Sequence, residues 1–152
     1  LGLKIVRGAY MEQERERAIE NNYPSPIHVD KQSTDDDYDA AVEYCIDNID
    51  SINICVGSHN ELSNLKTTKK ISQLNIKNDD PRIEFAQLLG MSDNLSFNLA
   101  HHKYNVAKYV PYGPVKSVMP YLFRRAEENT SIKGQVGREL HLIEKELRRR
   151  NQ

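Results

Sequence analysis

The sequence predicts an α/β fold in which four parallel strands are covered by helices. Three observations lead to this prediction. Short apolar segments alternate with longer segments of helix-forming residues, an order typical of a parallel sheet with helices outside it. The apolar segments are rich in β-branched residues, which favour strands. The length of 152 residues is well short of the roughly 250 that a complete (β/α)8 barrel requires.

The first strand is expected at residues 3–9, where an apolar run ends in small residues. A helix rich in Glu, Arg and Ala follows at 11–21, and the two prolines within 23–26 cannot continue it. A second helix is predicted to begin with Ser33 as its cap, because aspartates follow within one turn and suit the helix dipole. This helix is expected to end at about Asn48.

The remaining elements continue the alternation. We expect strands and helices at 52–57 (strand), 61–74 (helix), 83–88 (strand), 93–101 (helix), 106–110 (strand), 115–129 (helix) and 136–149 (helix). Four strands could form a small doubly wound sheet or the carboxyl-terminal half of a (β/α)8, TIM-like barrel followed by a terminal helix. The chain opens on an apolar run without an initiator methionine, so we favour the half barrel.

Composition and charge argue against several classes of protein. The 21 Lys and Arg residues balance 22 Asp and Glu residues, whereas nucleic-acid-binding proteins normally have a basic excess. No run of 18 apolar residues exists, so we expect no transmembrane helix, and the first residues do not resemble a signal peptide. Cys45 and Cys55 lie among apolar residues without the spacing of a metal site, which favours buried thiols over a disulfide.

Candidate functional residues follow the predicted strands. In parallel α/β folds, active-site residues gather beyond the carboxyl ends of the strands. Polar residues, aromatic residues and glycines occupy these positions, in the segments 7–10, 58–61, 87–90 and 109–113. His59 has no metal-ligand companion at helical spacing. We therefore expect it to donate a hydrogen bond to a ligand or to the backbone.

Two adjacent arginines lie on the predicted helix at 115–129. Tyr121, Arg124, Arg125 and Glu128 recur along one stripe of this helix. Two guanidinium groups beside an aromatic ring could bind a small carboxylate through paired hydrogen bonds. The residues alone also allow a solvated helix face on which Arg124 pairs with Glu128, four positions further on.

Five segments, in order and with matching gaps, resemble the proline dehydrogenase family, closest to its single-function, eukaryotic-like branch. They are KIVRGAY at 4–10, SHN at 58–60, FAQLLGM at 85–91, YVPYGP at 109–114 and YLFRRAEEN at 121–129. The resemblance implies the carboxyl-terminal half of a flavin-binding (β/α)8 barrel. The amino-terminal half is then expected to be absent from residues 1–152.

The resemblance also implies substrate-binding residues. Arg124 and Arg125 match the pair that binds the proline carboxylate. Tyr109 and Tyr121 match tyrosines that pack around the substrate ring, and Leu88 matches an apolar wall of that pocket. A tyrosine ring at 109 leaves no room for a hydroxyl group on C4 of the substrate, so proline should be preferred over 4-hydroxyproline.

A further set of residues matches the segments that bind FAD. Lys4 occupies a position where many bacterial members have an arginine near the flavin N5, and it is expected to be catalytic together with Tyr109. Tyr10 matches an aromatic residue beside the isoalloxazine. The other cofactor-binding residues expected here are Arg7, Gly8, Ala9, Ser58, His59 and Glu128.

The reaction expected from the resemblance is oxidation of L-proline to 1-pyrroline-5-carboxylate by hydride transfer to FAD. Proline has no leaving group and no acidic carbon, so this oxidation needs a hydride-accepting cofactor. A carboxylate clamp would fix the position of the ring. The electrons are expected to pass to a membrane quinone, with no metal and no nucleic acid involved.

Location and completeness follow from the same resemblance. The protein is expected in the bacterial cytoplasm with peripheral membrane association, or on the matrix side of the mitochondrial inner membrane. A lysine and an aspartate of the family's active site lie on earlier strands, so residues 1–152 alone are expected to have little or no activity. Two alternatives stay open: another barrel enzyme acting on a small carboxylate, such as an aldolase or amidohydrolase using His59, and a non-catalytic α/β interaction module.

Overall fold

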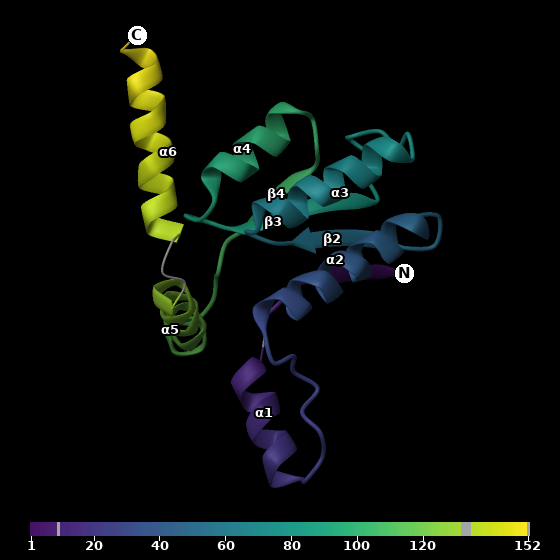
Figure 1. The fold of residues 1–152 in the computed structure, drawn as a ribbon, viewed down its shortest axis with the longest axis vertical. Coiled ribbons are helices and arrows are strands. Elements are labelled where there is room, and N and C mark those ends of the chain that lie inside the picture. Colours follow the sequence, from purple (N-terminus) through teal and green to yellow (C-terminus); the bar gives the residue numbers. More distant parts are fainter. Residues whose placement is uncertain (9, 132–134, 152) are drawn as a thin grey trace. The chain divides into compact units, whose positions relative to one another are not determined.

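Four parallel strands form one sheet, with helices between them in the sequence (Figure 1). The structure is a computed structural model that describes residues 1–8, 10–131 and 135–151, apart from the side chains at 124–131, 135–139 and 142. The strands are β1 (Gly2–Ile5), β2 (Asn53–Gly57), β3 (Ile83–Leu88) and β4 (Val106–Tyr109). The chain forms two compact units, residues 1–110 and 111–152, and the sheet belongs to the first.

The strand order distinguishes between the two sheets that the sequence allows. The order is β1-β2-β3-β4, and each neighbouring pair is parallel. In a doubly wound sheet the strand order reverses at a switch point, whereas the wall of a (β/α)8 barrel is built from consecutive strands. The predicted α/β class is confirmed, and the order is that of half a barrel wall.

One face of the sheet packs against helices and forms the core. The helices of the first unit are α1 (Met11–Glu20), α2 (Lys31–Asp47), α3 (Glu61–Gln73) and α4 (Asp93–His101). Helix α2 contacts α3, β1 and β2, and α4 contacts β3 and β4. Because side chains alternate between the faces of a strand, Ile54 and Val56 of β2 and Ile83 and Phe85 of β3 share the covered face, where all four are buried.

The opposite face, here named the open face, carries different residue types. By the same alternation it holds Lys4, Cys55, Gly57, Glu84, Ala86, Leu88, Ala107 and Tyr109. Lys4, Glu84 and Tyr109 are exposed, while Cys55 is half-buried. Both cysteines carry free thiols, as predicted, but only Cys45 is buried. The open face therefore combines three exposed polar side chains with small and apolar residues, and it is partly accessible.

Two predicted boundaries differ from those of the structure by more than two residues. Helix α2 begins at Lys31, because Asp30 caps it by accepting a hydrogen bond of 2.7 Å from the Ser33 backbone N–H. Strand β1 ends at Ile5 and not at residue 9. Gly8 and Tyr10 have φ angles of 78° and 59°, in the left-handed region that a strand does not use. The chain therefore turns sharply just after β1.

The second unit consists of two helices. They are α5 (Val115–Ser131) and α6 (Gln135–Arg150), within two residues of the predicted bounds. Pro120 lies inside α5 and has no backbone N–H to donate to the preceding turn. Within the described residues, no helix combines the length and apolar composition needed to cross a bilayer.

Candidate active site

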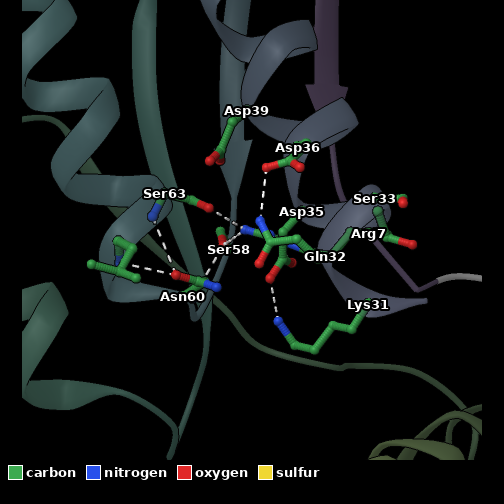
Figure 2. Close-up of polar contacts among 12 residues, drawn as sticks. Arg7, Lys31, Gln32, Ser33, Asp35, Asp36, Asp39, Ser58, Asn60 and Ser63 are labelled. Atoms are coloured by element: carbon green, nitrogen blue, oxygen red, sulfur yellow. Dashed lines mark hydrogen bonds and ion pairs between the residues drawn. The ribbon is translucent and has the colours of Figure 1, made fainter.

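Arg7 and Ser58, both predicted to bind a cofactor, meet at the carboxyl ends of β1 and β2. Arg7 Nη2 donates a hydrogen bond of 2.9 Å to Ser58 Oγ and one of 2.6 Å to Ser63 Oγ in the first turn of α3. Arg7 Nη1 forms an ion pair with Asp35 of α2. Figure 2 shows these contacts converging on the guanidinium group from three elements. Arg7 thus ties the loop after β1 to α2 and to the start of α3.

The surroundings of this guanidinium group are partly buried and charged. The Arg7 side chain is 17% exposed, and its Cζ lies 3.9 Å from the centroid of the Tyr38 ring, a cation–π distance. Burial raises the pKa of Tyr38 to about 12, so its phenol is neutral. Asp35 also pairs with Lys31. Two cations therefore share one carboxylate, which leaves the group of Lys31, Asp35 and Arg7 with a net positive charge.

Asp35 is ionised despite its position. Burial raises the pKa of its carboxyl, but hydrogen bonds from Lys31 and Arg7 outweigh this and hold the pKa below its ordinary value. An arginine has five N–H donors, and the contacts of Arg7 use three of them. Its Nε–H and one Nη1–H are not used by the residues that the structure describes. Together with the net positive charge, these donors suit an anionic ligand.

His59 lies directly beyond the end of β2 and binds within the protein. Its Nδ1 is 3.0 Å from Ser92 Oγ, and its Nε2 accepts a long hydrogen bond of 3.5 Å from the Leu88 N–H. Burial, and then the charge of Lys108, lower the pKa of His59, so the ring is neutral and its Nδ1 carries the proton. Toward the Leu88 backbone His59 is therefore an acceptor, and its predicted role as a donor to a ligand stays a prediction.

The open face brings Lys4 and Tyr109 together across the sheet. The Lys4 Nζ lies 5.1 Å from the centroid of the Tyr109 ring, although β1 and β4 are the outer strands. Gly57 of β2 lies beside the Lys4 side chain and leaves room for Val6. A Cβ atom there would lie 3.4 Å from Lys4 Cε and only 2.7 Å from Val6 Cγ1. Tyr109 also pairs in register with Leu88, so the two predicted catalytic residues share one face with Leu88, which was predicted to line the substrate pocket.

The other predicted cofactor residues of the first unit lie in the turn after β1. Gly8 has open space where a Cβ would stand, and its φ of 78° favours glycine. The Tyr10 side chain is 70% exposed. Ala9 lies outside the described residues. Their cofactor roles stay predictions.

The predicted carboxylate clamp lies on α5, in the second unit. Tyr121 is half-buried. The helix includes Arg124, Arg125 and Glu128, whose side chains lie outside the described part of the structure. Their binding roles therefore stay predictions.

Sequence reasoning missed Asp35, Ser63 and Gly57. The sequence did contain a signal for Asp35. Asp35 lies three residues before Tyr38, which is on the buried face of α2. An aspartate on a buried face needs a cationic partner. Ser63 and Gly57 carry no comparable pattern, because each acts through a side chain from another strand or loop.

The sequence of the chain is similar to a known protein family and to individual members of it. The sequence model of the family described as "Proline dehydrogenase" matches residues 1–138. "Proline dehydrogenase 2, mitochondrial" of Arabidopsis thaliana is 42% identical over 153 residues, which cover 99% of this chain and 32% of the relative. The hydroxyproline dehydrogenase of Xenopus laevis is 40% identical over 153 residues, covering 98% of this chain and 33% of the relative. The chain thus spans about a third of the length of both relatives.

A solved structure shows the same fold. The crystal structure of proline utilization A from Bdellovibrio bacteriovorus, inactivated by N-propargylglycine, matches with a TM-score of 0.78 at 30% identity. The match covers 87% of this chain and 14% of that protein.

Proposed function

Because the chain belongs to the proline dehydrogenase family, we propose that it forms the carboxyl-terminal half of a barrel that oxidises L-proline to 1-pyrroline-5-carboxylate with FAD. One observation carries the proposal most directly. Lys4 and Tyr109, the two residues expected to be catalytic, meet on the open face of the sheet, 5.1 Å from charge to ring. Leu88, expected to line the substrate pocket, is the register neighbour of Tyr109.

The half barrel is supported by the sheet itself. Its four strands are consecutive and parallel, which is half of the eight that close a (β/α)8 barrel. The open face would line the interior of that barrel. The strand ends that hold Arg7, Ser58 and His59 would lie at its carboxyl-terminal rim, where barrel enzymes bind their ligands.

The donors of this chain fit a flavin nucleotide. Arg7 has unused N–H groups in a cluster of net positive charge, which suits the pyrophosphate. We propose that Arg7, Gly8, Ala9, Ser58 and His59, together with Glu128, hold FAD, and that Tyr10 packs beside the isoalloxazine. Lys4 would place a positive charge near the reacting edge of the ring. When bound, FAD would supply the acceptor for the hydride that proline releases.

The substrate would be fixed by its carboxylate. We propose that Arg124 and Arg125 bind this group through paired hydrogen bonds, and that Tyr109, Tyr121 and Leu88 enclose the pyrrolidine ring. Holding both ends of a small ring limits its motion and favours a reactive approach. The likeness to proline and to hydroxyproline dehydrogenases is almost equal. Tyr109 supports proline as the preferred substrate, because its ring offers an added hydroxyl group little space.

We further propose a membrane quinone as the final electron acceptor. The protein would then associate peripherally with a membrane. The Arabidopsis relative is named as mitochondrial, which supports a mitochondrial location. Within the mitochondrion we propose the matrix side of the inner membrane.

A chimera tests the proposal. In it, the part of the Arabidopsis relative that precedes the matching segment is fused before Leu1 of this chain. The purified chimera should contain flavin and oxidise proline with a redox dye as acceptor, and a trapping amine should detect pyrroline-5-carboxylate. Residues 1–152 alone should not turn over. A chimera that folds, contains a stoichiometric metal and takes up no flavin would favour another barrel enzyme, and one that binds neither would favour an interaction module.

A further inference from the structure

We propose that Asp35 is a positioning residue of the cofactor site. Asp35 is itself bound by Lys31, and it holds the Arg7 guanidinium group against Ser58 and Ser63 so that the unused N–H groups of Arg7 keep fixed directions. The inference rests on the proposed flavin site, of which Arg7 is part. Asp35 acts only through Arg7.

The need for such a residue follows from the position of Arg7 in the chain. Arg7 lies two residues beyond β1, in a turn whose Gly8 and Tyr10 have left-handed φ angles. The pairing of β1 with β2 ends at Ile5, so among the residues described in this turn none is fixed by a ladder hydrogen bond of the sheet. The side chain of Arg7 is therefore fixed by its partners, and Asp35 is the charged partner among them.

Asp35 is well suited to this role because α2 fixes it. Asp30 caps the helix one turn earlier, through the Ser33 N–H. Lys31, four residues before Asp35, pairs with the second carboxylate oxygen. Figure 2 shows the Asp35 carboxylate between Lys31 and Arg7. The Asp35 side chain is 16% exposed, so little water competes for the ion pair.

Removal of the Asp35 charge has two effects of opposite sign on an anionic ligand. It raises the net positive charge of the cluster, which by Coulomb attraction alone would tighten binding. It also frees Arg7 from its charged partner, so the guanidinium group can leave Ser58 and Ser63 for water. A positioning role requires the second effect to exceed the first. The direction of the change in affinity therefore distinguishes positioning from a contribution of charge alone.

Asp39 provides a matched control on the same helix. It lies four residues after Asp35, its side chain is 11% exposed, and it forms an ion pair of 2.6 Å with Lys66 of α3. Asp39→Asn removes an exposed ion pair between α2 and α3, with no hydrogen bond or ion pair to Arg7 among the described contacts. A loss of FAD affinity that arises only from weaker packing of α2 on α3 should therefore appear in both the Asp35 and the Asp39 variant.

The experiment measures the dissociation constant of FAD in the chimera, by flavin fluorescence, together with the melting temperature of the flavin-free protein. Asp35→Asn should weaken FAD binding by about tenfold, which corresponds to the loss of one charge-assisted contact. Asp39→Asn should change the dissociation constant of FAD by less than about twofold. The melting temperatures of the two variants should be similar. In an Arg7→Lys background, Asp35→Asn should have less than about a twofold further effect, because the group through which it acts is already altered.

Three results would overturn the inference: tighter or unchanged binding in Asp35→Asn, equal losses in the Asp35 and Asp39 variants, or losses in the Arg7 and Asp35 variants that multiply independently. If the unaltered chimera folds but takes up no FAD, the proposed function fails, and the inference fails with it. A chimera that binds FAD and is indifferent to Asp35 rejects the inference alone.

Discussion

The two faces of the sheet differ in what they are made of. The covered face holds Ile54, Val56, Ile83 and Phe85, each at most 2% exposed, while the open face holds Lys4, Glu84 and Tyr109 among small residues. Parallel sheets are normally buried on both faces and read as continuous apolar runs. The open face departs from this pattern, because three exposed polar side chains interrupt it. The covered face thus carries the stability of the fold, and the open face carries the proposed chemistry.

The largest effect on stability is expected for a substitution on the covered face. Phe85→Ala removes a fully buried ring that packs edge-to-face against Tyr104, with centroids 5.5 Å apart. It should lower the free energy of unfolding of the chimera by about 3–5 kcal/mol, measured by urea denaturation. Tyr109→Ala on the open face is the control and should cost less than about 1 kcal/mol. Similar losses at both positions would contradict a division of roles between the faces.

Substrate selectivity provides the next test, on the open face itself. Burying a hydroxyl group without a partner costs about 1–3 kcal/mol, so the chimera should prefer proline over 4-hydroxyproline by roughly ten- to a hundredfold in kcat/KM. Tyr109→Ser should reduce this preference, because it opens space and supplies a hydrogen-bonding partner. Steady-state kinetics with both substrates decides the point. Equal kcat/KM values for the two substrates in the unaltered chimera, or a ratio that Tyr109→Ser leaves unchanged, would show that Tyr109 does not line the substrate pocket.

The carboxylate clamp extends the test to α5. Replacing Arg124 or Arg125 with lysine keeps the charge but loses the paired hydrogen bonds of a guanidinium group. KM for proline should rise at least about tenfold, or about 1.4 kcal/mol, while flavin content per protein stays the same. If flavin is lost and the KM of the remaining holoenzyme is unchanged, the two arginines serve the cofactor and not the substrate.

The smallest effect is expected at His59. Its pKa is lowered by burial and by Lys108, so between this lowered pKa and the ordinary value of 6.5 the unfolded chain binds more protons than the folded one. Stability should therefore fall as the pH drops below about 6.5. His59→Gln should flatten this part of the curve, whereas substitution of the exposed His101 should not. Urea unfolding at several pH values measures this dependence of the free energy of unfolding on pH. If the dependence is unchanged in His59→Gln, another group is responsible for it.

The sequence predicts the covered face better than the open one. Strand β3 and helix α4 match their predicted bounds to the residue, because burial on one side imposes a periodic apolar pattern. The start of α2 was missed because Asp30, Ser33 and Asp35 are all of residue types that occur at helix starts. Only the hydrogen bond from the Ser33 N–H to the Asp30 carboxylate identifies the cap. Asp35 was accordingly assigned to the helix dipole and not to Arg7.

The candidate site was only partly predictable, for a related reason. Arg7, Ser58, Lys4 and Tyr109 were found because each belongs to a segment that resembles a family motif. Gly57 and Ser63 owe their importance to side chains that reach them from distant positions in the chain. Such contacts leave no local pattern, so only the structure reveals them.

The consecutive order of the strands has a consequence for the route by which the sheet forms. Gly2 of β1 pairs with Asn53, 51 positions further on, whereas Phe85 of β3 pairs with Val106 only 21 positions away. The entropy lost on closing a loop grows with the logarithm of its length, so the first pairing costs about 0.8 kcal/mol more than the last. Folding of this region should therefore nucleate at β3 and β4 and add β2 and then β1. The loop that carries Arg7 would then be the last of the strand-end loops to settle, on a site whose other strands are already in place.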